Sequence, residues 1–476
     1  MKFPQFPYRP ILAACAALLL CAATAAAAEP ARPNIVFLFA DDLGYADLSV
    51  YGSPHIQTPH LDGLADGGMR FTDFYAASAV CSPSRAATLT GRFPVRVGVY
   101  SWILGPTQAG RGENKAHKMH LPADETTIAG YLKRGGYATG HFGKWHLGGA
   151  LVEGVGAGPN PGDHGFDHWL ATENNAAPSH RNPGNFIRNG EPVGEVEDYS
   201  CQFVVNEALA WLDSREDKEQ PFFLNIWFNE PHRSGGPAAP QHLEARHQDT
   251  RLPAYYGAVE NVDMAIGRLL GRLDAMGVGE NTLVVFSSDN GSYLEGSNDP
   301  LRGRKTQLWE GGIRVPGIVR WPGHVEPGTV TDTPAGVVDL LPTFCEAAGV
   351  APDGKPLDGT SLLPLLRGEP FARAKPLYWF YHPSRPVAVI REGDWCLTAD
   401  PEIDLPRGNM FLESYIGDIK ATALTHFQLF NLRRDIGQDQ DVAAEHPEVF
   451  AEMKRKMIEL HAEVVEEAPD WRAWEW

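Results

Sequence analysis

The chain has 476 residues, of which 43% are hydrophobic and 21% are charged, so it can bury a full core and has the composition of a soluble globular enzyme. Its formal net charge of −19 argues against nucleic-acid binding, because binding phosphates requires a basic surface. An anionic substrate would instead need a locally basic pocket.

The N-terminus has the pattern of a secretory signal peptide. Lys2 and Arg9 precede a small and apolar run over residues 11–28, which ends in alanines at 26–28 before Glu29. An uncleaved membrane anchor is the alternative, because the run is nearly long enough to span a bilayer. The alanine-rich end favours cleavage after residue 28, which predicts an exported protein, periplasmic or secreted, with no stable membrane anchor.

The cysteines do not indicate a disulfide scaffold. Two of the six lie in the predicted signal peptide, and Cys81 lies in the motif described below. Only Cys201, Cys345 and Cys396 remain, so at most one disulfide could form among them. The sequence leaves open whether it does.

The first predicted strand leads directly into two carboxylates. Residues 34–40 form a continuous apolar run, which is typical of a strand buried on both faces of a parallel sheet. Asp41 and Asp42 follow it. They fit equally well a solvated turn before Gly44 or a pair of oxygen ligands for a divalent ion.

Three later apolar runs repeat this arrangement. They cover residues 136–142, 221–228 and 283–288. Because ligands bind at the carboxyl ends of the strands in open α/β sheets, we expect the polar side chains after these runs to lie close together. These side chains are Lys144, His146, His232, Asp289 and Asn290.

Helical patterns alternate with these strands over residues 125–134, 199–212, 255–276 and 337–349. The alternation predicts an α/β fold with a large, mostly parallel sheet between layers of helices. The stretch 148–198 has little periodicity and is predicted to be an active-site loop that helps to select the substrate. Its charged residues His180, Arg181 and Arg188 are each more typical of the surface than of a substrate contact.

The C-terminal part has a different character. Short strands are predicted over residues 377–381, 387–391, 395–398 and 427–432, and an amphipathic helix over residues 449–465. This pattern predicts a smaller domain, residues 371–476, with an antiparallel sheet and one packed helix. It would follow a catalytic domain over residues 29–370.

One short motif combines a cysteine with an arginine one helical turn later. Cys81, Pro83 and Arg85 form a Cys-x-Pro-x-Arg pattern, followed by Leu-Thr-Gly at 89–91. This pattern resembles the signature of the formylglycine-dependent sulfatases of the alkaline phosphatase superfamily. Further segments match that family in order, namely residues 39–45, 58–62, 71–75, 143–148, 231–232, 288–291, 301–305 and 310–316. Residues 432–442 depart from the family's commoner Asp-Pro-x-Glu form.

The resemblance implies an alkaline-phosphatase-like fold and the hydrolysis of sulfate esters. It implies that a separate maturation enzyme oxidises Cys81 to Cα-formylglycine, whose hydrate is the nucleophile. It further implies one bound Ca²⁺, with Mg²⁺ as the less favoured ion. The ligands of that ion would be the modified Cys81 together with Asp41, Asp42, Asp289 and Asn290.

The resemblance also assigns roles to the basic residues. Arg85 and Lys144 would hold the formylglycine hydrate, and Lys144 and Lys305 would bind the sulfate oxygens. His232, with help from Lys305, would protonate the leaving alcohol. His146 would take a proton from the hydrate, so that the bound sulfate is expelled and the aldehyde returns.

Two alternatives compete with a sulfatase. One is a phosphodiesterase or phosphonate monoester hydrolase of the same superfamily. The other is an inactive glycan- or calcium-binding protein, which would be expected to have lost one of the catalytic residues, whereas none is missing. Residues 81–100 resemble the arylsulfatase A and N-acetylgalactosamine-6-sulfatase branches, which implies a sulfated glycan or oligosaccharide substrate. The sugar, the sulfate position and the choice between endo and exo action stay open.

Overall fold

The computed structural model describes residues 1–5, 32–103, 119–152, 158–294, 296–405, 407 and 415–470. The chain divides into two units, Met1–Arg32 and Pro33–Trp476. The apolar run and the cleavage site of the predicted signal peptide lie outside the described residues. Within the described residues, no helix has both the length and the apolar character that crossing a membrane requires.

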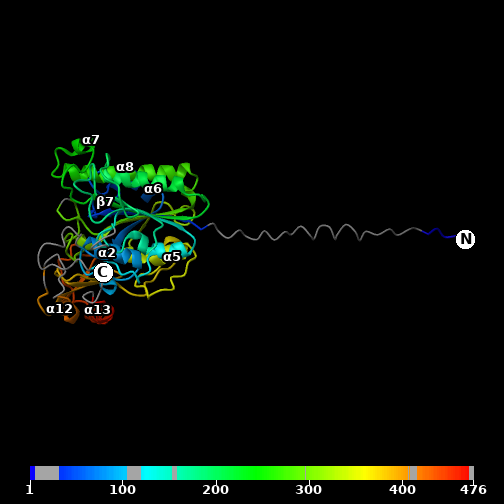
Figure 1. Ribbon diagram of the computed structural model, residues 1–476. Coiled ribbons are helices and arrows are strands. Elements are labelled where there is room, and N and C mark those ends of the chain that lie inside the picture. Colours follow the sequence, from blue (N-terminus) through cyan, green and yellow to red (C-terminus); the bar gives the residue numbers. More distant parts are fainter. Residues whose placement is uncertain are drawn as a thin grey trace. The chain divides into compact units, whose positions relative to one another are not determined.

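An eleven-stranded sheet forms the centre of the second unit (Figure 1). Its strand order is β10-β2-β9-β8-β1-β7-β3-β4-β5-β6, and β11 pairs with β2 beside this path. The strands are β1 (Asn34–Asp41), β2 (Met69–Tyr75), β3 (Ala138–Lys144), β4 (His168–Thr172), β5 (Ile187–Arg188), β6 (Glu191–Pro192), β7 (Phe222–Pro231), β8 (Thr282–Ser288), β9 (Arg314–Arg320), β10 (Thr329–Thr331) and β11 (Ala335–Gly336).

The central strands run parallel, as the sequence predicts. β1 pairs in parallel with β8 on one side and β7 on the other, and β7 continues to β3 and β4. Ala40 lies opposite Ser288, and Asp41 lies opposite Pro231. The carboxyl ends of β1, β7 and β8 therefore meet at one edge of the sheet. β9 is the exception within this region, because it runs antiparallel to both β8 and β2.

Helices cover both faces of the sheet. Val36 and Leu38 of β1 pack in the core on the side of α6 and α8, whereas Phe37 and Phe39 pack in the core that includes α2 and α5. Figure 1 shows α6 and α8 on one face and α2 and α5 on the other. The main helices are α1 (Pro59–Asp66), α2 (Cys81–Thr90), α3 (Pro94–Val97), α5 (Ile128–Arg134), α6 (Ser200–Ser214), α8 (Pro253–Ala275) and α10 (Leu340–Ala347).

Part of the predicted loop 148–198 belongs to the sheet. Strand β4 pairs in parallel with β3, and β5 and β6 extend this edge as an antiparallel hairpin. The expectation of a long loop is therefore wrong for His168–Thr172. The segment is only five residues long, so its own pattern is too short to indicate a strand, and its pairing with β3 places it in the sheet.

The C-terminal region forms the predicted antiparallel sheet and helix. The sheet contains β12 (Leu377–Phe380), β13 (Ala388–Glu392), β14 (Trp395–Pro401) and β15 (Leu424–Asn431), and α13 (Pro447–Glu467) packs with it. Trp379 Nε1 donates to the carbonyl of Ala76 at 2.7 Å, and Arg391 Nη2 lies 2.8 Å from Asp73 Oδ2. These contacts join the region to the end of β2. A domain boundary at residue 370 stays a prediction.

The question of a disulfide is answered for the described cysteines. Cys81, Cys201, Cys345 and Cys396 are all buried and free. Cys201, Cys345 and Cys396 therefore form no disulfide with one another, and core packing holds the fold together.

Candidate active site

Four oxygen-bearing side chains meet at the ends of β1 and β8. The Asp42 amide donates to Asp289 Oδ1 at 3.1 Å, and Asn290 Nδ2 donates to Asp42 Oδ1 at 2.7 Å. Asp41, Asp42, Asp289 and Asn290 are all buried. The parallel register of the two strands brings these residues together although about half of the chain separates them. The sequence prediction of a strand-end cluster is therefore confirmed.

Cys81 is the first residue of α2 and faces this cluster. Its Sγ lies 3.6 Å from Asp41 Oδ1 and 3.9 Å from Asp42 Oδ1. One ligand atom from each of Asp41, Asp42, Cys81 and Asp289 lies within 4.8 Å of all the others. Burial raises the pKa of the Cys81 thiol to about 12, although nearby lysines oppose the shift. An unmodified thiol here would therefore be a poor nucleophile at neutral pH.

Arg85 lies one helical turn after Cys81 and is fully buried. Its Nε and Nη2 donate to Asp289 Oδ2 at 3.0 and 2.7 Å, and Nη2 lies 3.7 Å from Asp41 Oδ1. The guanidinium carbon also lies 5.0 Å from the ring centroid of Trp227. Arg85 therefore compensates two buried carboxylates, which would otherwise be costly to ionise.

Two lysines compensate the rest of the acidic cluster. Lys144 Nζ donates to Asp41 Oδ2 at 2.8 Å, and Lys305 Nζ lies 2.6 Å from both Asp42 oxygens and 3.5 Å from Cys81 Sγ. Burial opposes ionisation of Asp42, but the Lys305 charge and its neighbours outweigh burial and hold the pKa of Asp42 well below its usual range. Asp42 in turn raises the pKa of Lys305 against the effect of burial. Three carboxylates are thus matched by three cations.

His146 presents an open ring nitrogen. Its Nε2 lies 2.8 Å from the carbonyl of Ile103, which can only accept, so Nε2 carries the proton. Its Nδ1 is buried and has no hydrogen-bond partner within the described part of the chain. Burial, followed by the Lys144 charge, lowers the pKa of His146 well below its usual value. The neutral ring therefore offers an unoccupied proton acceptor.

His232 faces the cluster from the end of β7. Its Nε2 lies 3.4 Å from Asp42 Oδ2, and Asn175 Nδ2 lies 3.1 Å from its Nδ1. Burial lowers the pKa of His232 to about 3, although Asp42 opposes the shift. The buried ring of His180 donates from Nε2 to the His232 carbonyl at 2.7 Å. The expectation that His180 is a surface charge is therefore wrong. Its ring is buried against residue 232, which lies 52 positions away in the chain and could not be recognised from the local sequence.

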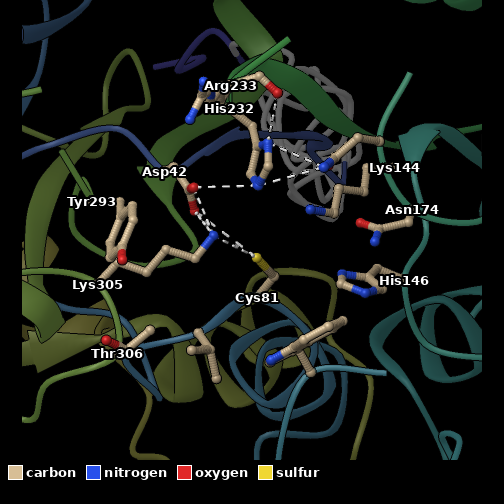
Figure 2. A pocket seen from close by; sticks show the side chains of 13 residues that line it. Asp42, Cys81, Lys144, His146, Asn174, His232, Arg233, Tyr293, Lys305 and Thr306 are labelled. Carbon is tan, nitrogen blue, oxygen red and sulfur yellow. Dashed lines mark hydrogen bonds and ion pairs between the residues drawn. The ribbon is translucent and has the colours of Figure 1, made fainter. Parts of the chain in front are cut away.

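These side chains surround a cavity of about 360 Å³ (Figure 2). The predicted residues Asp42, Cys81, Lys144, His146, His232 and Lys305 line it, whereas Asp41, Arg85, Asp289 and Asn290 lie buried around Asp42 and Cys81. The predicted residues thus converge on one site. Sequence reasoning did not single out the remaining lining residues, which are Val80, Trp102, Asn174, Asn175, Arg233, Tyr293 and Thr306. Of these, Asn174 and Asn175 lie in the stretch that was predicted to select the substrate.

The family model "Sulfatase" matches residues 33–350. The chain belongs to the sulfatase family. This sulfatase is 36% identical to human arylsulfatase A over 410 residues, which cover 79% of the chain and 76% of that protein. It is 35% identical to the N-acetylgalactosamine-6-sulfatase of Rattus norvegicus over 379 residues, which cover 75% of the chain and 69% of that protein.

A similar solved structure is that of Ps i-CgsB in complex with k-i-k-neocarrahexaose. It superposes on the sulfatase with a TM-score of 0.75 at 29% identity, over 93% of this chain and 94% of that one. The predicted family and the alkaline-phosphatase-like fold are therefore confirmed. The chain is an enzyme that hydrolyses sulfate esters.

The donor atoms of the sulfatase site fit a divalent metal ion. Asn290 Oδ1 is buried and has no hydrogen-bond partner among the described residues, and it adds a neutral oxygen to the three carboxylates. An all-oxygen set of this kind suits Ca²⁺ or Mg²⁺ and suits zinc poorly.

Proposed function

We propose that this sulfatase removes sulfate from sulfated carbohydrates, using Cα-formylglycine that a separate maturation enzyme makes from Cys81. One calcium ion would be held by Asp41, Asp42, Asp289 and Asn290 together with the modified residue 81. The observation that carries the proposal is the position of Cys81 in the cavity, against the carboxylate cluster and Lys305. We also propose that residues 1–28 direct export, which the intact mass of the exported chain would test.

Formylglycine and the calcium ion would supply chemistry that the side chains of the chain lack. When present, formylglycine provides a hydrated aldehyde as the nucleophile, and the calcium ion offsets negative charge on oxygen. The chain's own residues position the sulfate and move the protons. Lys144 and Lys305 line the cavity and bind sulfate oxygens as charge develops on them. Burial and Asp41 raise the pKa of Asp289 to about 6, and Arg85 opposes this rise while it holds the start of α2 against the cluster.

The two histidines handle protons on different walls of the cavity. His232 points into the cavity near Lys305. The negative charge of a bound sulfate would raise the low pKa of His232, and the protonated ring, assisted by Lys305, then donates its proton to the leaving alcohol oxygen. His146 offers its unprotonated Nδ1 to the same cavity and accepts a proton during turnover. In Figure 2, His232 lies above Cys81 and His146 lies to its right.

The choice of a sulfated carbohydrate as the substrate is supported by the relatives and by the positive charges that line the cavity. A relative is named for N-acetylgalactosamine-6-sulfate hydrolysis, and the solved structure of Ps i-CgsB contains an oligosaccharide. The cavity concentrates Lys144, Lys305 and Arg233 on a chain with a net charge of −19. These local cations are what a sulfated substrate needs in order to bind an acidic protein.

Released sulfate, measured by ion chromatography, tests this function. The substrates are position-defined sulfated sugars, 4-nitrophenyl sulfate and bis(4-nitrophenyl) phosphate. We expect kcat/KM for the best sulfated sugar to exceed that for the phosphodiester by at least about 100-fold, because the site discriminates through transition-state contacts. Faster hydrolysis of the phosphodiester would instead support a phosphodiesterase or phosphonate monoester hydrolase.

Removal of metal is expected to abolish sulfate release and to lower the melting temperature. An ion that binds only the folded chain stabilises it by about 2.7 kcal/mol at 100 times its Kd. Activity and Tm are measured after EGTA treatment, with metal content followed by mass spectrometry, and again after adding Ca²⁺ or Mg²⁺. We expect Ca²⁺ to restore both more completely.

Two carboxylate variants provide the comparison. Asp42→Asn should weaken rescue by Ca²⁺, because it removes a charged ligand, whereas Asp249→Asn at an exposed position should behave as the wild type does. Full activity in protein that contains no metal would contradict the proposed calcium site.

A further inference from the structure

A second cavity adjoins the catalytic one. It has a volume of about 420 Å³, and Tyr293 lines both cavities. Each volume lies in the range of about 300–1,000 Å³ that is typical of small-molecule sites. Tyr293 lies three residues after Asn290 and is 43% exposed. Figure 2 shows its ring at the edge of the catalytic cavity, beside Lys305. A ligand that passes Tyr293 would therefore reach both cavities.

Two exposed arginines give the second cavity its charge. The Arg304 guanidinium carbon lies 5.4 Å from the ring centroid of Tyr293, and Arg251 Nη2 donates to the Leu294 carbonyl at 2.9 Å. Both arginines line the cavity, and within the described part of the chain neither guanidinium forms an ion pair with a carboxylate. Asp299 also lines it, and its carboxylate accepts a hydrogen bond from Ser297. Among the described lining residues, the cations outnumber the carboxylates.

The loops that bear these residues are held together by hydrogen bonds. The Ser292 amide donates to Asn298 Oδ1 at 2.9 Å, Asn298 Nδ2 donates back to the Ser292 carbonyl at 2.9 Å, and the Lys305 amide donates to the same carbonyl at 3.0 Å. Arg304 and Lys305 are consecutive residues, yet they line different cavities. The second cavity therefore has a defined position relative to the lysine that faces the sulfate.

We propose that the second cavity is a subsite for another sulfated sugar residue of the same glycan, next to the residue whose sulfate enters the catalytic cavity. The proposal rests on the function proposed above and narrows the substrate to chains with sulfate on neighbouring residues. Tyr293 offers an aromatic face for a sugar ring, and guanidinium groups bind sulfate oxygens through paired N–H donors. Tyr293 also holds Arg304 in place through the cation–π contact.

The test compares a small sulfate ester with sulfated tetrasaccharides on the full-length matured enzyme. For 4-nitrophenyl sulfate and for tetrasaccharides of iota-carrageenan and heparin, which carry sulfate on neighbouring residues, kcat/KM is measured in the wild type and in Arg251→Gln, Arg304→Gln and the double variant. Arg268→Gln is the matched control, because Arg268 is exposed on α8 outside both cavities. Kd values for the tetrasaccharides are measured by calorimetry at two salt concentrations.

We expect the ratio of tetrasaccharide to 4-nitrophenyl sulfate kcat/KM to fall at least about tenfold in the double variant, which corresponds to about 1.4 kcal/mol. The tetrasaccharide Kd should rise by a similar factor and depend less on salt, while Arg268→Gln keeps the wild-type ratio. Tyr293→Ala should lower the same ratio, because it removes the ring that orients Arg304.

An unchanged ratio and Kd in the double variant, or equal losses on both kinds of substrate, would overturn the subsite. So would a wild-type chain that binds neither tetrasaccharide. Failure of the proposed function would look different, since the wild type would then release no sulfate from any ester. In that case the Kd values alone decide whether the second cavity binds the tetrasaccharide. A loss of tetrasaccharide affinity that is confined to the arginine variants would still support an anionic glycan site.

Discussion

Replacing Cys81 with alanine is expected to reduce sulfate ester hydrolysis by about 10⁴-fold or more, the scale seen when an enzyme loses its nucleophile. The substitution removes the side chain from which formylglycine would form. It leaves the carboxylates and lysines around it in place, so the cavity can still bind a sulfated sugar. Steady-state kinetics on the best substrate and calorimetric binding of that substrate would separate loss of turnover from loss of binding.

Cys345→Ala provides a matched control, because Cys345 is also a buried free cysteine but lies in α10, away from the cavity. It should keep the wild-type kcat. Peptide mass spectrometry of the wild type should show that the side chain at position 81 has lost its sulfur and carries an aldehyde. An active enzyme with an intact thiol at position 81 would refute the formylglycine proposal.

Arg85→Leu is expected to destabilise the fold by about 3–5 kcal/mol, because it leaves Asp289 buried without its cation, whereas Asp41 keeps its ion pair with Lys144. The free energy of unfolding is measured by urea denaturation in EGTA, so that no calcium ion compensates the carboxylates. Sulfate release should also be lost when calcium is restored, because the start of α2 is no longer held against the cluster.

Arg188→Leu is the comparison for this variant. Arg188 forms two hydrogen bonds of 2.7 Å to Glu207, but its side chain is 42% exposed, so solvent screens the pair. Its loss should cost at most about 1 kcal/mol. If the two substitutions lowered the free energy of unfolding by similar amounts, burial would not make the ion pair of Arg85 more costly to lose than that of Arg188, which would contradict the prediction.

The secondary structure was predictable wherever a segment carries a long pattern of its own. The apolar runs before Asp41 and Asp289 are buried strands, and the helical spacing in residues 255–276 corresponds to α8. The strand β4 and the support of His232 by His180 were not predictable in this way. A five-residue strand and a lone histidine take their roles from partners that the local sequence does not contain.

By itself, the sequence determined the family, the strands that carry the polar cluster and those residues of the candidate site that lie in the matched motifs. Apolar runs and motif spacing are local properties, and strand ends in a parallel sheet meet at one edge. Only the tertiary structure decided which charge faces which, as in the contact of Lys305 with Asp42 across 263 positions of the chain. It also decided that Tyr293 lies between two cavities, because distances between loops depend on how the whole sheet and its helices pack.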